Sequence, residues 1–209
     1  MQPTTKATTP KQTVSFEEFL EMLDDESHAE WVDGTVVLKP PASVEHQSVS
    51  GDILFLLAMW VGHYRLGDVF HPPLQVFLSL PDGKKVSREP DLVVVLNDRQ
   101  AQLKEYYCEG APNLIVEVID PLLTEDLREK FIEYEAAGVP EYWIIDPERE
   151  YAEFWQLDDT GAYRVAYAGS EGVYHSRELP GFWLRVEWIW RQQPLLNILR
   201  EWGILPQGV

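Results

Sequence analysis

Two short apolar runs, each holding one carboxylate, constrain this chain more than any other feature. The first is Asp91-Leu-Val-Val-Val-Leu96 and the second is Leu114-Ile-Val-Glu-Val-Ile119. Runs this rich in valine, isoleucine and leucine predict buried β-strands. An ionised acid in such a strand is costly unless a metal, a cation or hydrogen bonds compensate its charge. The chain must therefore fold so that Asp91 and Glu117 find partners of that kind.

The pairing of the two runs decides what the acids can do. Strand alternation places Glu117 on the same face as Ile115 and Ile119. If the two strands are neighbours, Asp91 lies close to Glu117, and both acids stay ionised only with a cation between them. Oxygen ligands of this type favour Mg²⁺ or Mn²⁺ over Zn²⁺. Such a metal can activate water for phosphodiester hydrolysis.

The remaining sequence predicts helices and strands on both sides of these runs. Helices are expected over residues 15–25, 43–64, 125–137 and 195–202, with a helical turn near 100–106. Strands are expected over residues 30–32, 35–38, 74–80, 85–96, 113–119, 142–146, 151–157, 163–168 and 183–186. This order indicates an α/β chain in the broad sense, an α+β mixed sheet flanked by helices. Residues 1–13 read as a disordered tail and residues 14–209 as one domain.

Local signals support several of these boundaries. Ser15 and Glu18 have the spacing of a capping box at the start of a helix. Asp33-Gly34 is typical of a tight turn between two strands. Gly138, followed by Pro140, predicts the end of the helix over residues 125–137.

The charge of the chain bears on its partners. The 209 residues include 17 basic and 35 acidic side chains, which gives a net charge of −18. Such a charge repels polyanions at long range and argues against tight nonspecific nucleic-acid binding. A locally positive groove stays compatible with it, because salt screens exposed charges over ~8 Å.

The same composition bears on the compartment. Cys108 is the one cysteine, so no disulfide forms within the chain. The longest apolar run, Ile53 to Val61, has nine residues, well short of the ~20 that span a bilayer. The first ten residues lack the apolar core of a signal peptide. We therefore expect a cytoplasmic protein without a membrane segment.

Several sequence blocks stand in a distinctive order. They are Glu30-Trp-Val-Asp-Gly34 with His46, Arg88-Glu-Pro-Asp91, Ala111-Pro-Asn-Leu-Ile-Val-Glu-Val118, a helix with Asp126 and Lys130, and Gly138-Val-Pro-Glu-Tyr-Trp-Ile-Ile-Asp-Pro147. In this order they resemble the Uma-two family of restriction-endonuclease-like proteins, within the PD-(D/E)XK nuclease superfamily. The resemblance covers roughly residues 15–190. It implies the restriction-endonuclease-like fold and a metal-dependent endonuclease acting on DNA.

The resemblance also implies roles for individual side chains. Asp91 and Glu117 match the two metal-binding carboxylates of the superfamily. Glu30 matches an acid that serves as a further ligand of Mg²⁺ or Mn²⁺. His46 matches a histidine on the second helix of the family. The resemblance further suggests a homo-oligomer, most simply a dimer.

The catalytic lysine departs from the superfamily pattern. It normally stands two residues after the second acid, where this chain has Ile119. Lys130, on the following helix, matches the lysine of this family and would orient the attacking water. A structural interpretation is that Lys130 is only a surface partner of Asp126.

Structural interpretations of the other residues stay open at this stage. Glu117 can instead form a buried ion pair with Arg88, Arg128 or Lys130. A histidine on an apolar helix face, such as His46, is more often a packed, hydrogen-bonded core residue than a ligand. The alternative function is a binding or assembly module that keeps the nuclease fold without turnover.

Overall fold

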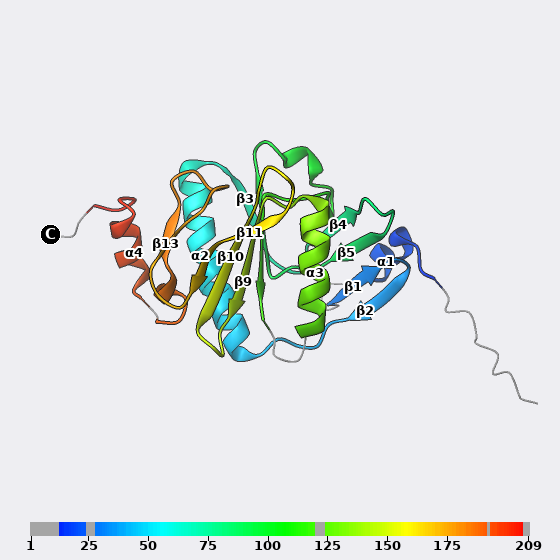
Figure 1. Ribbon diagram of the computed structural model, residues 1–209, viewed down its shortest axis with the longest axis horizontal. Helices are drawn as coiled ribbons and strands as arrows, with labels where there is room; N and C mark the ends of the chain where they lie inside the picture. The colour runs from blue at the N-terminus through cyan, green and yellow to red at the C-terminus, as the bar shows by residue number, and fades with distance from the viewer. Residues whose placement is uncertain (1–12, 24–27, 120–123, 192, 207–209) are drawn as a thin grey trace, which may run out of the picture.

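The computed structural model describes residues 13–23, 28–119, 124–191 and 193–206 (Figure 1). The helices are α1 Phe16–Met22, α2 Val44–Tyr64, α3 Thr124–Ala137 and α4 Leu195–Glu201, with 3-10 turns at Gln100–Gln102 and Val186–Trp188. The strands are β1 Ala29–Val32, β2 Thr35–Leu38, β3 Gly67–Phe70, β4 Gln75–Ser79, β5 Lys85–Arg88, β6 Leu92–Leu96, β7 Tyr107–Glu109, β8 Leu114–Val118, β9 Glu141–Asp146, β10 Tyr151–Leu157, β11 Tyr163–Gly169, β12 Val173–His175 and β13 Trp183–Arg185. Of the predicted tail, only Thr13 is among the described residues. Residues 24 and 25 of the first predicted helix also lie outside them.

The strands form two larger sheets and one small one. The six-stranded sheet has the order β11-β10-β9-β8-β6-β3, and the five-stranded sheet has the order β2-β1-β5-β4-β7. β12 and β13 pair with each other. β8 and β9 are parallel and are joined through α3, whereas β6 runs antiparallel to β8. The mixed α+β arrangement agrees with the prediction, although the strands divide between sheets rather than forming one.

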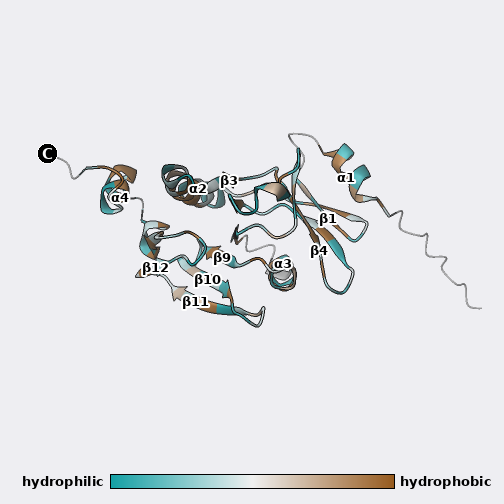
Figure 2. Cartoon of the chain, turned by 90° about the horizontal axis from the view of Figure 1, so that it is seen from above, coloured by the Kyte–Doolittle hydropathy of each residue, from teal (hydrophilic) through white to brown (hydrophobic). Residues whose placement is uncertain are grey.

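Helices α2 and α3 cover opposite faces of the six-stranded sheet, as the view from above shows (Figure 2). Leu114, Val116 and Val118 of β8 pack into the core on the α2 side. Ile115 packs on the other side, in the core that includes Tyr134 of α3. The alternation predicted for this strand is confirmed, and it turns Glu117 toward α3.

The prediction of a single strand over residues 85–96 is wrong, because this stretch forms two strands in different sheets. β5 pairs with β1 and β4, and β6 pairs with β3 and β8. Between them lies Glu89-Pro90-Asp91, where Pro90 has no N–H to continue a ladder. The chain passes from one sheet to the other here, which places Asp91 at the junction of the sheets.

Three short strands, β3, β7 and β12, were not predicted. Each has only three or four residues, so tertiary pairing decides their conformation more than local preference does. Gly67 begins β3. α2 ends at Tyr64, as predicted, and Arg65 follows it in the left-handed conformation. In the part of the chain described here, no helix combines the length and apolar character needed to cross a membrane.

Candidate functional site

A cavity of about 470 Å³ opens between α2, α3, the end of β8 and the junction between β5 and β6. The charged and imidazole side chains on its walls include Lys39, His46, Glu89, Asp91, Glu117 and Lys130. Four of the five residues predicted for the site therefore line one cavity. The exception is Glu30, which lies behind Lys130.

Asp91 reaches the cavity from the start of β6. Leu92 lies opposite Val116 across the antiparallel pair, so Asp91 projects beside the end of β8. Its Oδ2 atom accepts a hydrogen bond from the Val118 amide at 2.7 Å and lies 3.1 Å from Nε2 of His46. Burial raises the pKa of Asp91, but the contacts with His46, the charge of Lys39 and the Val118 amide together hold that pKa below its ordinary value.

His46 stands on the first turn of α2, facing Asp91. Burial lowers its pKa, but the hydrogen bond and charge of Asp91 have the larger combined effect and raise it. Its Nδ1 atom lies 3.5 Å from Oγ of Ser50, one turn along the helix. His46 is thus packed and hydrogen-bonded, as the structural interpretation expected, and its partner is the candidate acid Asp91.

Glu117 is 5% exposed and has a partner for each carboxylate oxygen. Oε1 accepts a hydrogen bond from the Tyr134 hydroxyl at 2.8 Å, and Oε2 accepts one from Nζ of Lys130 at 3.2 Å. Burial raises the pKa of Glu117 to about 7, in spite of the opposing charge of Lys130. The sequence interpretation missed Tyr134 because it assigned this side chain to the apolar face. Its position four residues after Lys130 places both on one side of α3.

Lys130 is 3% exposed, so its interpretation as a surface partner is wrong. Three carboxylates surround its Nζ atom: Glu30 at 2.9 Å, Asp126 at 3.1 Å and Glu117 at 3.2 Å. Burial opposes the charged form, but these acids outweigh it and raise the pKa of Lys130. The lysine therefore reaches from α3 to the strand acids, as the sequence interpretation required.

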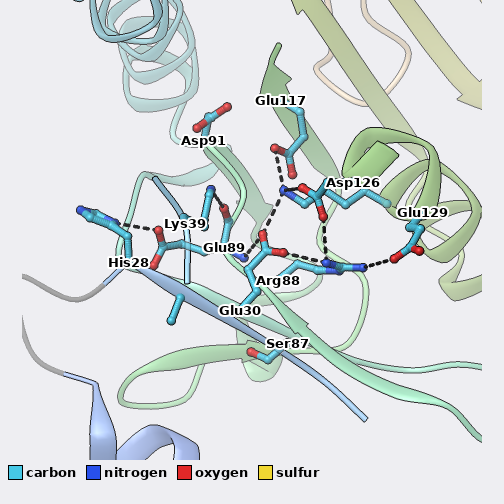
Figure 3. Close-up of polar contacts among 12 residues, drawn as sticks. His28, Glu30, Lys39, Ser87, Arg88, Glu89, Asp91, Glu117, Asp126 and Glu129 are labelled. Atoms are coloured by element: carbon cyan, nitrogen blue, oxygen red, sulfur yellow. Dashed lines mark hydrogen bonds and ion pairs between the residues drawn. The ribbon is translucent and has the colours of Figure 1, made fainter. Parts of the chain in front are cut away.

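Glu30 connects Lys130 to a second buried cation, Arg88. Figure 3 shows Glu30 beside Arg88. Its Oε2 atom lies 2.7 Å from Nη1 of Arg88, whose Nε donates to Glu133 of α3 at 2.7 Å. Burial raises the pKa of Glu30, but the charges of Lys130 and Arg88 lower it to about 2. Arg88 thus pairs with Glu30 and not with Glu117. The resulting chain of alternating charges joins the two sheets through α3.

The donor atoms on the cavity wall suit a hard divalent cation. Asp91 and Glu117 offer carboxylate oxygens from adjacent strands, and two such ligands leave room for water and a phosphate oxygen. No group of three His, Cys, Asp or Glu side chains that could hold a metal ion occurs within the described residues. Glu30 does not line the cavity, and both of its oxygens contact cations, so Asp91 and Glu117 are the two carboxylates that could hold such an ion.

Comparison with known proteins identifies the family of this chain. Residues 16–187 match Uma2, a family described as "Putative restriction endonuclease". The chain belongs to the Uma2 family. The matched residues run from the start of α1 into the 3-10 turn at 186–188 and include all five predicted site residues. Membership of Uma2 supports a nuclease that acts on nucleic acid.

A solved structure has the same fold as this Uma2 chain. It is described as the crystal structure of "a putative nuclease belonging to DUF820" from Anabaena variabilis. The TM-score is 0.69 and the sequence identity is 16%, with 84% of this chain and 97% of that chain covered. At this identity the likeness establishes the fold alone. None of the curated proteins compared with the chain matches it.

Proposed function

We propose that this Uma2 protein is a metal-dependent endonuclease that hydrolyses DNA phosphodiester bonds. The observation that supports it best is the meeting of Asp91 and Glu117 on one cavity wall, with the Lys130 ammonium 3.2 Å from Glu117. Asp91 and Glu117 would hold Mg²⁺ or Mn²⁺. Such a metal, when bound, would polarise the phosphate and lower the pKa of the attacking water.

Lys130 supplies the fixed positive charge of the proposed site. Of its three carboxylate partners, Asp126 has a side chain that is 29% exposed, whereas Glu30 and Glu117 are almost fully buried. A water or phosphate oxygen entering the cavity can therefore replace the Asp126 contact at the lowest cost in desolvation. In that position the ammonium orients the nucleophile and stabilises developing negative charge.

The remaining residues position these groups. Glu30 holds Lys130 from behind and is itself held by Arg88. These contacts favour a supporting role for Glu30 over the metal-ligand role expected from the resemblance. His46 and the Val118 amide fix one oxygen of Asp91. Side chains held in this way keep their geometry when substrate binds.

A cleavage assay tests the proposal. Supercoiled, linear duplex and single-stranded DNA are incubated with the protein and Mg²⁺ or Mn²⁺, and the products are resolved on gels. We expect cleavage by the wild type, abolition by EDTA, and a rate at least ~100-fold lower in Glu117→Gln. Glu105→Gln, an exposed acid outside the cavity, is the matched control and should cleave normally. Absence of cleavage on every DNA form, or an undiminished rate in Glu117→Gln, contradicts the proposal.

A second candidate is a binding or assembly module without turnover. It is favoured by the three carboxylate contacts of Lys130, which compensate the buried acids without a metal. This candidate predicts no saturable Mn²⁺ binding, whereas the nuclease requires it.

A further inference from the structure

Lys39 is a second lysine on the cavity wall, and the sequence interpretation did not single it out. It directly follows β2 and is partly buried. Its Nζ atom donates a hydrogen bond to the backbone carbonyl of Glu89 at 2.7 Å. Figure 3 shows the side chain directed toward the junction that carries Glu89 and Asp91.

The other cations around the site are neutralised by acids. Lys84, Arg88 and Lys130 each have a carboxylate oxygen within 3.2 Å. Within the described residues, by contrast, no carboxylate lies within 4.0 Å of Nζ of Lys39. In a chain with 35 acidic residues, an ammonium in a cavity wall without an acidic partner is available to an external anion.

Hydrogen-bonding capacity separates the two lysines of the cavity. An ammonium has three N–H donors. Three carboxylates surround Lys130, so its donors are matched within the protein. Lys39 uses one donor on a neutral carbonyl, which leaves two for a ligand. Its charge also acts on both acids: it helps to lower the pKa of Asp91 and opposes the rise that burial causes in the pKa of Glu117. Lys39 therefore lies within electrostatic range of the proposed reaction centre.

We propose that Lys39 binds a phosphate oxygen of the nucleic-acid substrate inside this cavity, next to the bond cleaved at Asp91 and Glu117. This inference rests on the proposed nuclease function. A lysine suits the task because its ammonium is a compact point charge that pairs with phosphate oxygens from several directions. The contact would give a strongly acidic protein a local site of attraction for a polyanion.

The competing explanation is that Lys39 only offsets the charge of the cavity acids. Both explanations predict that Lys39→Gln changes the site, but they differ in the ligand affected. A lysine that only offsets acids would, when removed, tighten Mn²⁺ binding and leave nucleic-acid affinity unchanged. A phosphate-binding lysine would, when removed, weaken nucleic-acid binding directly.

The test measures binding separately from cleavage. Fluorescence polarisation follows a short fluorescein-labelled single-stranded DNA, and an RNA of the same sequence, in EDTA at low ionic strength. Relative to wild type, we expect Lys39→Gln to weaken binding about tenfold or more. It should also reduce the slope of log affinity against log salt by about one. Lys39→Arg should retain most of the affinity. Lys104→Gln, an exposed lysine outside the cavity, should bind as wild type does.

Each other outcome overturns the inference. An affinity of Lys39→Gln within about twofold of wild type excludes a direct phosphate contact, and tightened Mn²⁺ binding in calorimetry would then identify charge compensation. If Lys104→Gln weakens DNA binding as much as Lys39→Gln does, the loss reflects the net charge of the protein and not a contact made by Lys39. Either result leaves the nuclease proposal intact if wild type cleaves DNA. If wild type neither binds nor cleaves nucleic acid, both proposals fail together. Thermal unfolding of each variant verifies that the comparison concerns folded protein.

Discussion

At the scale of single residues, Lys130 is the group on which the buried charges of the site depend. It contacts Glu30 and Glu117, both of which are 5% exposed or less. A buried ion pair adds little net stability when compared with apolar residues, but the loss of one partner leaves an uncompensated charge. The contribution of Lys130 to folding is therefore best measured by its removal.

Lys130→Met should destabilise the protein by about 3–5 kcal/mol, because Glu30 and Glu117 lose their shared cation. Urea denaturation followed by tryptophan fluorescence measures this change. Lys104→Met, at a lysine whose side chain is 40% exposed, should change stability by no more than about 0.5 kcal/mol. A Lys130→Met protein as stable as wild type would show that the acids do not need this lysine.

The lowered pKa of Glu30 predicts how the stability of the fold changes with pH. Its pKa in the folded protein is about 2, below the ordinary value of 4.5. Because the pKa is depressed, the charge of Glu30 stabilises the fold fully above pH 4.5, and this contribution falls as the pH drops toward 2. It amounts to roughly 3 kcal/mol.

The measurement compares urea midpoints of wild type and Glu30→Gln between these two pH values. The wild type should lose more stability on acidification than the variant, whose residue 30 does not titrate. Parallel pH profiles for the two proteins would contradict the assignment of this shift to Glu30.

At the scale of elements, the crossing between β5 and β6 creates the site. The five-stranded sheet carries Glu30 and Arg88, and the six-stranded sheet carries Glu117. Glu89-Pro90-Asp91 connects the sheets, and α3 places Lys130 between them. The site therefore needs the pairing that holds β6 against its neighbours β8 and β3.

Gly67, at the start of β3, provides a test of that pairing. A Cβ atom at this position would lie 2.2 Å from the carbonyl oxygen of Val95 in β6. Gly67→Ala should therefore force the strands apart and destabilise the fold by about 1–3 kcal/mol. Gly62→Ala is the matched control, since open space surrounds this exposed helical position.

The control should raise stability by up to about 1 kcal/mol through better helix propensity. Thermal unfolding of both variants measures the two effects, and a Gly67→Ala protein as stable as the control would contradict the close contact of β3 with β6.

The sequence predicted the elements of this site better than their assignment to sheets. The apolar run of β8 and the capping box at Ser15 are local signals, and the structure has both. The division of residues 85–96 depends on which strands pair, and pairing partners are far apart in the sequence. The sequence also did not predict the contacts that Arg88, Tyr134 and Lys39 make, because the type of a side chain does not identify a partner far away in the chain.

At the scale of the whole molecule, one apolar core contains residues of both larger sheets and of α3. Cys108 of the edge strand β7 is fully buried in this packing, and burial raises the pKa of its thiol to about 11. A protonated, inaccessible thiol reacts slowly with disulfide reagents.

We therefore expect modification of Cys108 at a rate limited by global unfolding. A chromogenic disulfide reagent measures the thiol, and tryptophan fluorescence after a jump in denaturant, extrapolated to water, measures unfolding. Modification much faster than unfolding would show that β7 opens separately from the rest of the sheet.

Binding of Mn²⁺ tests most directly whether Asp91 and Glu117 form a metal site or only a structural cluster. Isothermal titration calorimetry should give saturable binding to the wild type and to the control Asp82→Asn, an exposed acid in a turn. Asp91→Asn, verified as folded, should lose this binding. Absence of saturable binding to the wild type, or unchanged binding in Asp91→Asn, would contradict a metal-dependent nuclease at this site.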